Sequence, residues 1–324
     1  MKLKGSHTVS ILHLDNPAAF SMDLVASRAF DPDLRDGSDT PVSGFVSCLD
    51  PLVADPLSQA RVGQYFIFSL RYDQKKVPAP MLRLAVAEAV RERELETGRR
   101  LSRAQKKEIK ENVRLALVRR MGYSSAVTDF AFDPETGLLL CFEGPGKRLD
   151  AVVAAICELG CGVRRDFDIP LADLFVALCQ ESVAVDGYHF SDAGAVTLVG
   201  EKGEEMAKVS ASNAEEVVMN AMDHGYAIQS MRLRVEDPAN DEFCAFSPAL
   251  SDFGLALKGL TFSVPAIDLP PEGMPLPDAE AAAAPKPSVD GEETDLILLL
   301  ESVIMTARLF DRLIDIVEGG GAKG

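Results

Sequence analysis

The sequence predicts an α+β protein from which a basic helical hairpin projects. Segments with the alternation and β-favouring residues of strands lie on both sides of residues 75–120, together with amphipathic helical segments. Residues 75–120 themselves follow helical spacing and oppose the rest of the chain in charge. A helical insert between strands, followed by a strand pair and a helix, is typical of a mixed α+β unit.

The charge of residues 75–120 marks them as a candidate binding surface. They hold 14 Lys and Arg against 6 Asp and Glu, which is a net charge of +8. The whole chain carries −17, so the remaining residues together carry −25. A basic island on an acidic protein is a candidate electrostatic contact for a polyanion.

Local start and stop signals predict two helices in this stretch. Pro78 and Pro80 favour a helix start. The first N–H groups of a helix have no acceptor within the helix, so proline, which lacks an N–H, forfeits no hydrogen bond there. Gly98 is a natural stop for the first helix. Ser102 and Gln105 have the spacing of a capping box for the second helix, which we expect to run to the end of the stretch.

The second helix is expected to carry a continuous cationic face. At about 100° per residue, five basic side chains fall within roughly a 100° arc: they are Arg103, Lys106, Lys107, Lys110 and Arg114. An apolar stripe lies beside them, and Glu108 and Glu111 are predicted to point elsewhere. The alternative is a solvated hairpin, in which Glu92 and Glu96 pair with nearby arginines.

Two α+β regions surround the hairpin. In the first, over residues 1–72 and 121–169, we expect strands at 8–14, 44–49, 65–72, 126–132 and 138–142, with helices at 17–29 and 149–159. In the second, over residues 170–264, we expect helices at 171–180 and from Asn213 to Met222, and strands at 183–190, 195–200, 228–235 and 255–264.

The C-terminal part combines a linker with a strong helix. Residues 265–293 are rich in Pro, Ala and acidic residues, which predicts a flexible linker because they offer little to bury. Within residues 294–324, a helix is expected over 295–318. Its apolar surface includes six candidate dimer-interface residues: Leu299, Val303, Phe310, Leu313, Ile314 and Val317. This helix either packs on its own domain or on a second copy of the chain.

Composition and missing motifs exclude several classes. No signal peptide and no apolar run of roughly 18 residues is present, and six cysteines are read as reduced thiols, so a cytoplasmic protein is expected. The sequence has no P-loop, and Cys157 and Cys161 lack the second ligand pair of a zinc site. Glu108 begins a minimal E-x-K nuclease pattern, but nothing local completes a metal site around Asp166 and Asp168. We therefore expect no metal, no cofactor and no enzymatic activity.

Several segments, taken in order, resemble the RdgC family of recombination-associated bacterial DNA-binding proteins. The segments that carry the resemblance are residues 28–32 (Arg-Ala-Phe-Asp-Pro), 44–46 (Gly-Phe-Val), 63–64 (Gly-Gln), 77–80 (Val-Pro-Ala-Pro), the basic hairpin to 120, a strand reaching 133 with Gly-Leu at 137–138, a helix led by 215–217, and residues 310–320. Their order and spacing, rather than any one motif, support the resemblance.

The resemblance implies a horseshoe-shaped subunit with centre, tip and base regions. Two subunits would close into a ring-shaped homodimer through tip–tip and base–base contacts, with duplex DNA passing through a basic hole. Family members bind DNA with little sequence preference and restrain the RecA recombinase by competing for DNA. On this mapping residues 73–120 are the tip, the C-terminal helix belongs to the base interface, and the protein is expected at the bacterial nucleoid.

We therefore predict sequence-independent binding of double-stranded DNA by a homodimer that restrains RecA-dependent recombination. Phosphate contacts are expected from the cationic face and then from four further arginines, which are Arg99, Arg100, Arg119 and Arg120. Tyr123 is a further candidate, about one position from where family members present an exposed phenylalanine that disturbs the duplex. The alternatives are a protein-interaction module that keeps the fold with weakened DNA binding, and a metal-dependent exonuclease.

Overall fold

The chain divides into two compact units. The computed structural model describes residues 5–36, 40–53, 55–56, 60–164, 169–180, 182–200, 206–209, 214–237, 240–251, 253–262 and 289–321. Unit 1 comprises Met1–Ser21, Arg61–Ile67 and Asp129–Gly324, and unit 2 comprises Met22–Ala60 and Phe68–Thr128. The finer division into regions made from the sequence stays a prediction.

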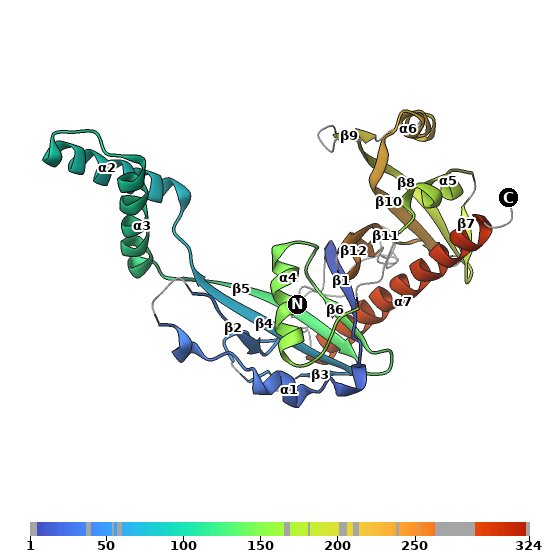
Figure 1. Ribbon diagram of the computed structural model, residues 1–324. Helices are drawn as coiled ribbons and strands as arrows, with labels where there is room; N and C mark the ends of the chain where they lie inside the picture. The colour runs from blue at the N-terminus through green and yellow to red at the C-terminus, as the bar shows by residue number, and fades with distance from the viewer. Residues whose placement is uncertain are drawn as a thin grey trace, which may run out of the picture. The chain divides into compact units, whose positions relative to one another are not determined.

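The structure is a mixture of strands and helices, which confirms the α+β class. The strands are β1 His7–His13, β2 Val42–Val46, β3 Arg61–Val62, β4 Tyr65–Lys75, β5 Tyr123–Asp133, β6 Leu138–Cys141, β7 Val183–Val185, β8 Tyr188–Val199, β9 Met206–Val209, β10 Ala227–Asp237, β11 Asn240–Ser251 and β12 Gly254–Phe262 (Figure 1). The helices are α1 Met22–Ser27, α2 Ala79–Thr97, α3 Arg103–Arg120, α4 Lys147–Glu158, α5 Leu171–Gln180, α6 Ala214–Asp223 and α7 Val289–Gly321, with 3-10 turns at Pro17–Ala19 and Pro32–Leu34. No helix in the described ranges is long and apolar enough to cross a membrane.

Hydrogen-bonded neighbours in the sheet follow the order β2-β4-β5-β6-β1-β12-β11-β10-β8-β7, with β3 on β4 and β9 on β8. The long strands β4 and β5 each contribute residues to both units. Their hairpin-side ends, at Lys75 and Tyr123, belong to unit 2. The strands therefore connect the basic insert directly to the sheet.

In unit 1, helix α7 packs on the sheet of its own unit. Leu300, Val303 and Leu313 have no exposed surface, and the ring of Phe310 meets that of Phe246 on β11 edge-on at 5.6 Å. The structure therefore shows the first of the two alternatives left open for this helix. The helix therefore contributes buried apolar side chains to the core of unit 1.

Unit 2 is built around the pair β2–β4. Phe30, Val42 and Val46 form a small buried cluster, and Phe45 and Phe68 lie edge-on at 5.7 Å. The chain at Phe30 runs so close to β2 that a Cβ on Gly44 would lie 2.4 Å from the Phe30 Cα atom. Only glycine tolerates this approach. The packing of Phe30 against Gly44 therefore holds the beginning of the segment that follows Phe30.

Three predicted elements were wrong in ways that packing explains. The helix expected over residues 17–29 is broken, because Phe20 adopts an extended conformation and buries its ring against Phe132 at 4.5 Å. The strand expected over 183–190 contains a two-residue turn, in which Asp186 and Gly187 both have positive φ. The C-terminal helix begins at Val289, shortly after Pro287, so the end of the predicted linker is helical; the rest of that linker lies outside the described residues.

Strand β11 was not predicted, and it contains Pro248, a residue that usually argues against a strand between two others. The structure resolves this conflict through register. The described pairing of β11 with β10 ends at Phe246, while the pairing with β12 continues from Pro248↔Leu257 to Ser251. Pro248 therefore lies in the part of β11 whose described pairing is with β12 and no longer with β10.

We predict that replacing Phe310 by alanine destabilises unit 1 by about 3–5 kcal/mol, because the change leaves a cavity against Phe246. Urea unfolding followed by far-UV circular dichroism measures the loss. Replacing Ile316, which is 47% exposed on the same helix, is the matched control and should change stability by less than about 0.5 kcal/mol. Equal effects of the two substitutions would contradict the packing of α7 described above.

Candidate nucleic-acid interface

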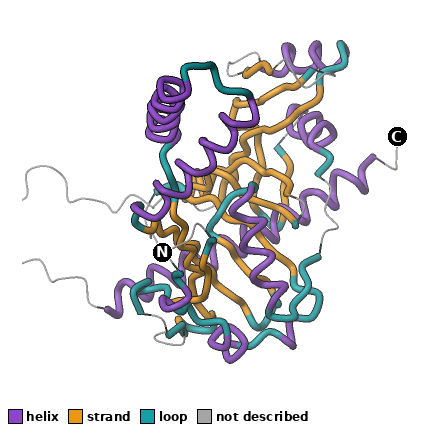
Figure 2. Tube along the Cα trace, turned by 60° about the vertical axis from the view of Figure 1, so that its left-hand side comes forward, coloured by secondary structure: helices purple, strands orange, loops and turns teal. Residues whose placement is uncertain are grey.

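The basic stretch forms the helical hairpin expected from its capping signals. Pro80 lies in the first turn of α2, and Gly98 ends that helix with a left-handed φ of 63°. Ser102 Oγ accepts the Gln105 N–H at 3.3 Å, and the Gln105 side chain accepts the Ser102 N–H at 3.0 Å. Figure 2 shows the two helices joined by their short loop. The start, stop and capping box predicted from the sequence are therefore confirmed.

Glu94 braces the two helices across the turn. Its carboxylate accepts the backbone N–H of Leu101 at 3.0 Å and forms a salt bridge with Lys106 at 3.1 Å. The hydrogen bond from Leu101, followed by that from Lys106, lowers the pKa of Glu94 below its usual value of 4.5. The brace is therefore intact near neutral pH.

The predicted cationic face of α3 lies on the surface. Arg103, Lys107 and Lys110 are exposed and form no salt bridge in the described part of the chain. Lys106 is exposed but forms a salt bridge with Glu94. Arg114 is half-buried and bonded to Glu111 at 2.7 Å, so the prediction that Glu111 points away from this face was wrong. Three of the five cations therefore stand unneutralised.

The remaining candidates divide by location. Arg99 and Arg100 are exposed in the loop between the helices, and Arg119 and Arg120 are exposed at the C-terminal end of α3. A similar pair expected from the alternative interpretation also occurs, because Arg93 and Glu96 form a salt bridge at 2.8 Å on α2. That salt bridge neutralises an arginine of α2 and none of the cations on the α3 face.

Tyr123 lies at the first position of β5 and is half-buried. The Lys75 ammonium and the Arg35 guanidinium each lie 5.2 Å from the centre of its ring. Such cation–π contacts contribute about 0.5–2 kcal/mol each, depending on solvation. The predicted DNA contact is therefore part of a cluster at the root of the hairpin, where the two strands pass into the two helices.

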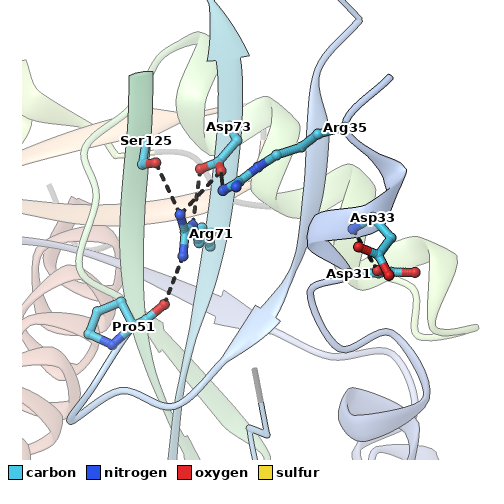
Figure 3. Close-up of polar contacts among 7 residues, drawn as sticks. All are labelled: Asp31, Asp33, Arg35, Pro51, Arg71, Asp73 and Ser125. Carbon is cyan, nitrogen blue, oxygen red and sulfur yellow. Dashed lines mark hydrogen bonds and ion pairs between the residues drawn. The ribbon is translucent and has the colours of Figure 1, made fainter. Parts of the chain in front are cut away.

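This cluster centres on a buried carboxylate, Asp73, that sequence reasoning missed. Asp73 is fully buried and accepts the Arg71 Nε–H at 3.0 Å and the Arg71 Nη2–H at 3.2 Å, and Arg35 donates to the same carboxylate (Figure 3). Arg71 also donates to the Pro51 carbonyl at 3.2 Å and to Ser125 Oγ at 3.4 Å. The available signal was the alternation of Arg71, Asp73 and Lys75 at the end of β4, which places an aspartate between two cations on one face of the strand.

The pKa of Asp73 reflects this pairing. Burial by itself would raise it, but the hydrogen bonds from Arg71, Ser125 and Arg35 outweigh burial and hold the pKa below its usual 3.8. The carboxylate is therefore charged at neutral pH. Its contribution to stability is present above about pH 4 and is lost as the pH falls through the lowered pKa.

The candidate dimer-interface residues on α7 are mostly buried in their own unit. Leu299, Val303, Phe310 and Leu313 have 7% exposed surface or less, and Ile314 and Val317 are half-buried. Their role in a dimer stays a prediction. The structure assigns the first four to the core of unit 1.

The residues considered for metal chemistry do not form a cluster where the structure describes them. No group of three His, Cys, Asp or Glu residues is close enough to hold an ion within the described ranges. Glu108 is exposed on α3, and Asp166 and Asp168 lie outside the described residues.

Residues 18–162 match a family model described as "Putative exonuclease, RdgC". This match supports the assignment to the RdgC family. The matched residues include the whole hairpin, Arg35, Asp73 and Tyr123. No curated protein matches the chain. The family match, which covers less than half of the chain, is in keeping with a DNA-related function in general terms.

We predict that the Glu94 brace is lost in acid. Because the pKa of Glu94 is lowered on folding, its bonds stabilise the hairpin above the usual value of 4.5 and disappear as the pH falls through the lowered pKa. The amide shift of Leu101, followed by NMR in leucine-labelled protein, should titrate with a midpoint below 4.5. The Glu94→Gln variant should show no such transition, and a midpoint above 4.5 would argue against the brace.

Proposed function

We propose that this protein binds double-stranded DNA through the phosphate backbone, without sequence preference, using the α3 face of the hairpin. One observation carries the proposal: Arg103, Lys107 and Lys110 are exposed side by side on one helix without a salt bridge in the described part of the chain. Neutralising phosphates with such side chains releases counterions, which drives binding regardless of base sequence. The RdgC match over residues 18–162 gives this surface a DNA-related context.

The distribution of charge also favours contact limited to the hairpin. Residues 75–120 carry +8 and the remainder of the chain carries −25, so a polyanion gains attraction at the hairpin and repulsion elsewhere. The proposed role in the cell follows the family resemblance: occupancy of duplex DNA by this protein restrains RecA-dependent recombination through competition. The proposal includes no catalytic step, and the protein acts by binding alone.

We predict that reversing two charges, Lys107→Glu with Lys110→Glu, weakens binding to every duplex alike by on the order of tenfold or more. Fluorescence anisotropy of labelled random-sequence duplexes at several salt concentrations measures this effect. The slope of log affinity against log salt should become smaller by about 2, because each lost phosphate contact contributes about 0.9.

A matched control reverses Lys147 and Lys208, which are exposed in unit 1, and therefore changes the net charge equally. This variant should bind nearly as well as the unaltered protein. Equal weakening by the control would mean that overall charge, rather than the α3 face, governs binding. The absence of binding by the unaltered protein at low salt would favour the protein-interaction alternative.

The same duplexes separate binding from the exonuclease activity that the family description names. Incubation with Mg²⁺ and with EDTA should leave the end label intact in both. Mg²⁺-dependent loss of the label, reduced by Glu108→Gln, would replace the proposal with the exonuclease alternative.

The proposal also includes a homodimer, and the hairpin offers apolar surface for one. Leu84 and Leu95 on α2 are each 74% exposed, and Met81 is 42% exposed on the same side of the helix. Exposed apolar residues that share one face indicate a contact with another surface. This surface supports the tip–tip contact that the family resemblance implies.

We predict that the double substitution Leu84→Glu with Leu95→Glu converts dimer to monomer, because it places charges in an apolar contact. Sedimentation velocity at micromolar concentration measures the change. Leu52→Glu, at a position 82% exposed in another part of unit 2, should leave the dimer intact. A dimer that survives the double substitution would move the contact away from α2.

A further inference from the structure

Five side chains at the root of the hairpin alternate between cation and aromatic ring. The Arg71 guanidinium lies 4.7 Å from the Phe30 ring centre, and Arg35 lies 5.3 Å from the same ring. Arg35 also lies 5.2 Å from the Tyr123 ring, and Lys75 lies 5.2 Å from that ring. We call these five residues, together with Asp73, the root cluster.

The root cluster joins three separate segments of unit 2. Phe30 and Arg35 come from the segment around the 3-10 turn Pro32–Leu34, which is anchored at Phe30 by the close approach to Gly44. Arg71, Asp73 and Lys75 occupy alternate positions of β4, and so share one face of the strand. Tyr123 opens β5. The cluster therefore lies at the two strand ends between which the hairpin is inserted.

The hairpin has little other means of keeping its direction. All residues of α2 and α3 are described, and among them Val118 alone is buried. The helices brace one another through Glu94, but the links to the sheet are short: residues 76–78 lead into α2 and residues 121–122 lead out of α3. Because the hairpin has so small a core, we expect its direction relative to the sheet to depend on contacts at the ends of β4 and β5.

Arg35 is the pivotal member of this cluster. Its side chain contacts both rings and the Asp73 carboxylate. Its Nε is buried and has no hydrogen-bond partner among the described residues, so Asp73 and the rings hold it in place. Lysine in this position would keep the charge but lose the planar guanidinium that lies over both rings.

We propose that the root cluster sets the direction of the hairpin relative to the sheet of unit 2, and that Arg35 and Asp73 are positioning residues for the α3 face. Neither residue has to touch DNA. The role in DNA binding rests on the function proposed above, whereas the mechanical role of the cluster does not. Preorganised surfaces bind more tightly because less orientational freedom is lost on association.

Electrostatics alone predicts the opposite sign for one variant, which makes the proposal testable. Asp73→Asn removes a negative charge near a DNA-binding surface, so a purely electrostatic effect would tighten binding. If Asp73 positions the hairpin, the same change releases Arg35 and Arg71 and weakens binding by roughly threefold to tenfold. Arg35→Lys keeps the charge and should weaken binding by a similar factor, with the salt slope unchanged because no phosphate contact is lost.

Asp33→Asn is the matched control, because Asp33 is exposed in the same segment as Arg35 and the change in charge is identical. It should tighten binding slightly or leave it unaltered. Urea unfolding and circular dichroism show which variants keep their fold. If Asp73→Asn does not fold, Arg35→Lys carries the test.

The direction of the hairpin is measured without DNA. Spin labels on a non-natural amino acid at Ser43 on β2 and Ala104 on α3, both exposed in unit 2, report their separation by pulsed electron resonance. This labelling avoids the native cysteines. The distance distribution should broaden in Asp73→Asn and Arg35→Lys, and should remain narrow in Asp33→Asn.

The outcomes separate this inference from the proposed function. Broader distances together with weaker DNA binding support both. Broader distances in a protein that does not bind DNA support the positioning role and overturn the proposed function. Unchanged distances in a folded Asp73→Asn or Arg35→Lys protein overturn the positioning role, whatever happens to DNA affinity.

Discussion

The attachment of the hairpin depends on one buried carboxylate. Asp73 has no exposed surface, and an unpaired charge in such a place is strongly unfavourable, so its partners are obligatory. Arg71 supplies two of the hydrogen bonds from the same strand, and Arg35 approaches from a segment 38 residues away. Once both guanidiniums are held, their stacking on Phe30 and Tyr123 follows from geometry. One charge thereby adds a polar link between three segments that the sheet already brings near one another.

This arrangement also gives the root of the hairpin a positive charge, like that of the hairpin itself. Arg35, Arg71 and Lys75 surround one carboxylate, which leaves an excess of positive charge in the root cluster. Exposed charges interact over a screening length of about 8–10 Å at physiological salt. A polyanion held against α3 is therefore affected most by charges within that length, which include those of the hairpin itself. Net charge is consequently a poor guide to what this surface attracts.

The hairpin was predictable because its determinants are local. Pro80, Gly98 and the Ser102–Gln105 pair act within one turn of helix, and the periodic cations of α3 follow from helical spacing alone. The errors have the opposite origin. Phe20 leaves the helical path to pack against a residue more than a hundred positions away, and Pro248 is tolerated in β11 because of where β10 stops pairing. The turn at Asp186–Gly187 was an exception, since an Asp-Gly pair between apolar segments is a hairpin signal that was available and overlooked.

The order of residues along the chain was enough to specify the α+β class, the basic hairpin and its capping, and the cations that face solvent, because each depends on composition or on neighbours within a few positions. The pairing of Arg114 with Glu111, three positions away on α3, is local and was misjudged from the sequence. Tertiary structure alone decided that Lys106 is already neutralised by Glu94 on the other helix. It also decided that α7 is core to its own unit, and that Tyr123 stacks between Arg35 and Lys75. These features require segments distant in sequence to meet, and the long-range partners of a buried charge such as Asp73 leave no periodic trace in the chain.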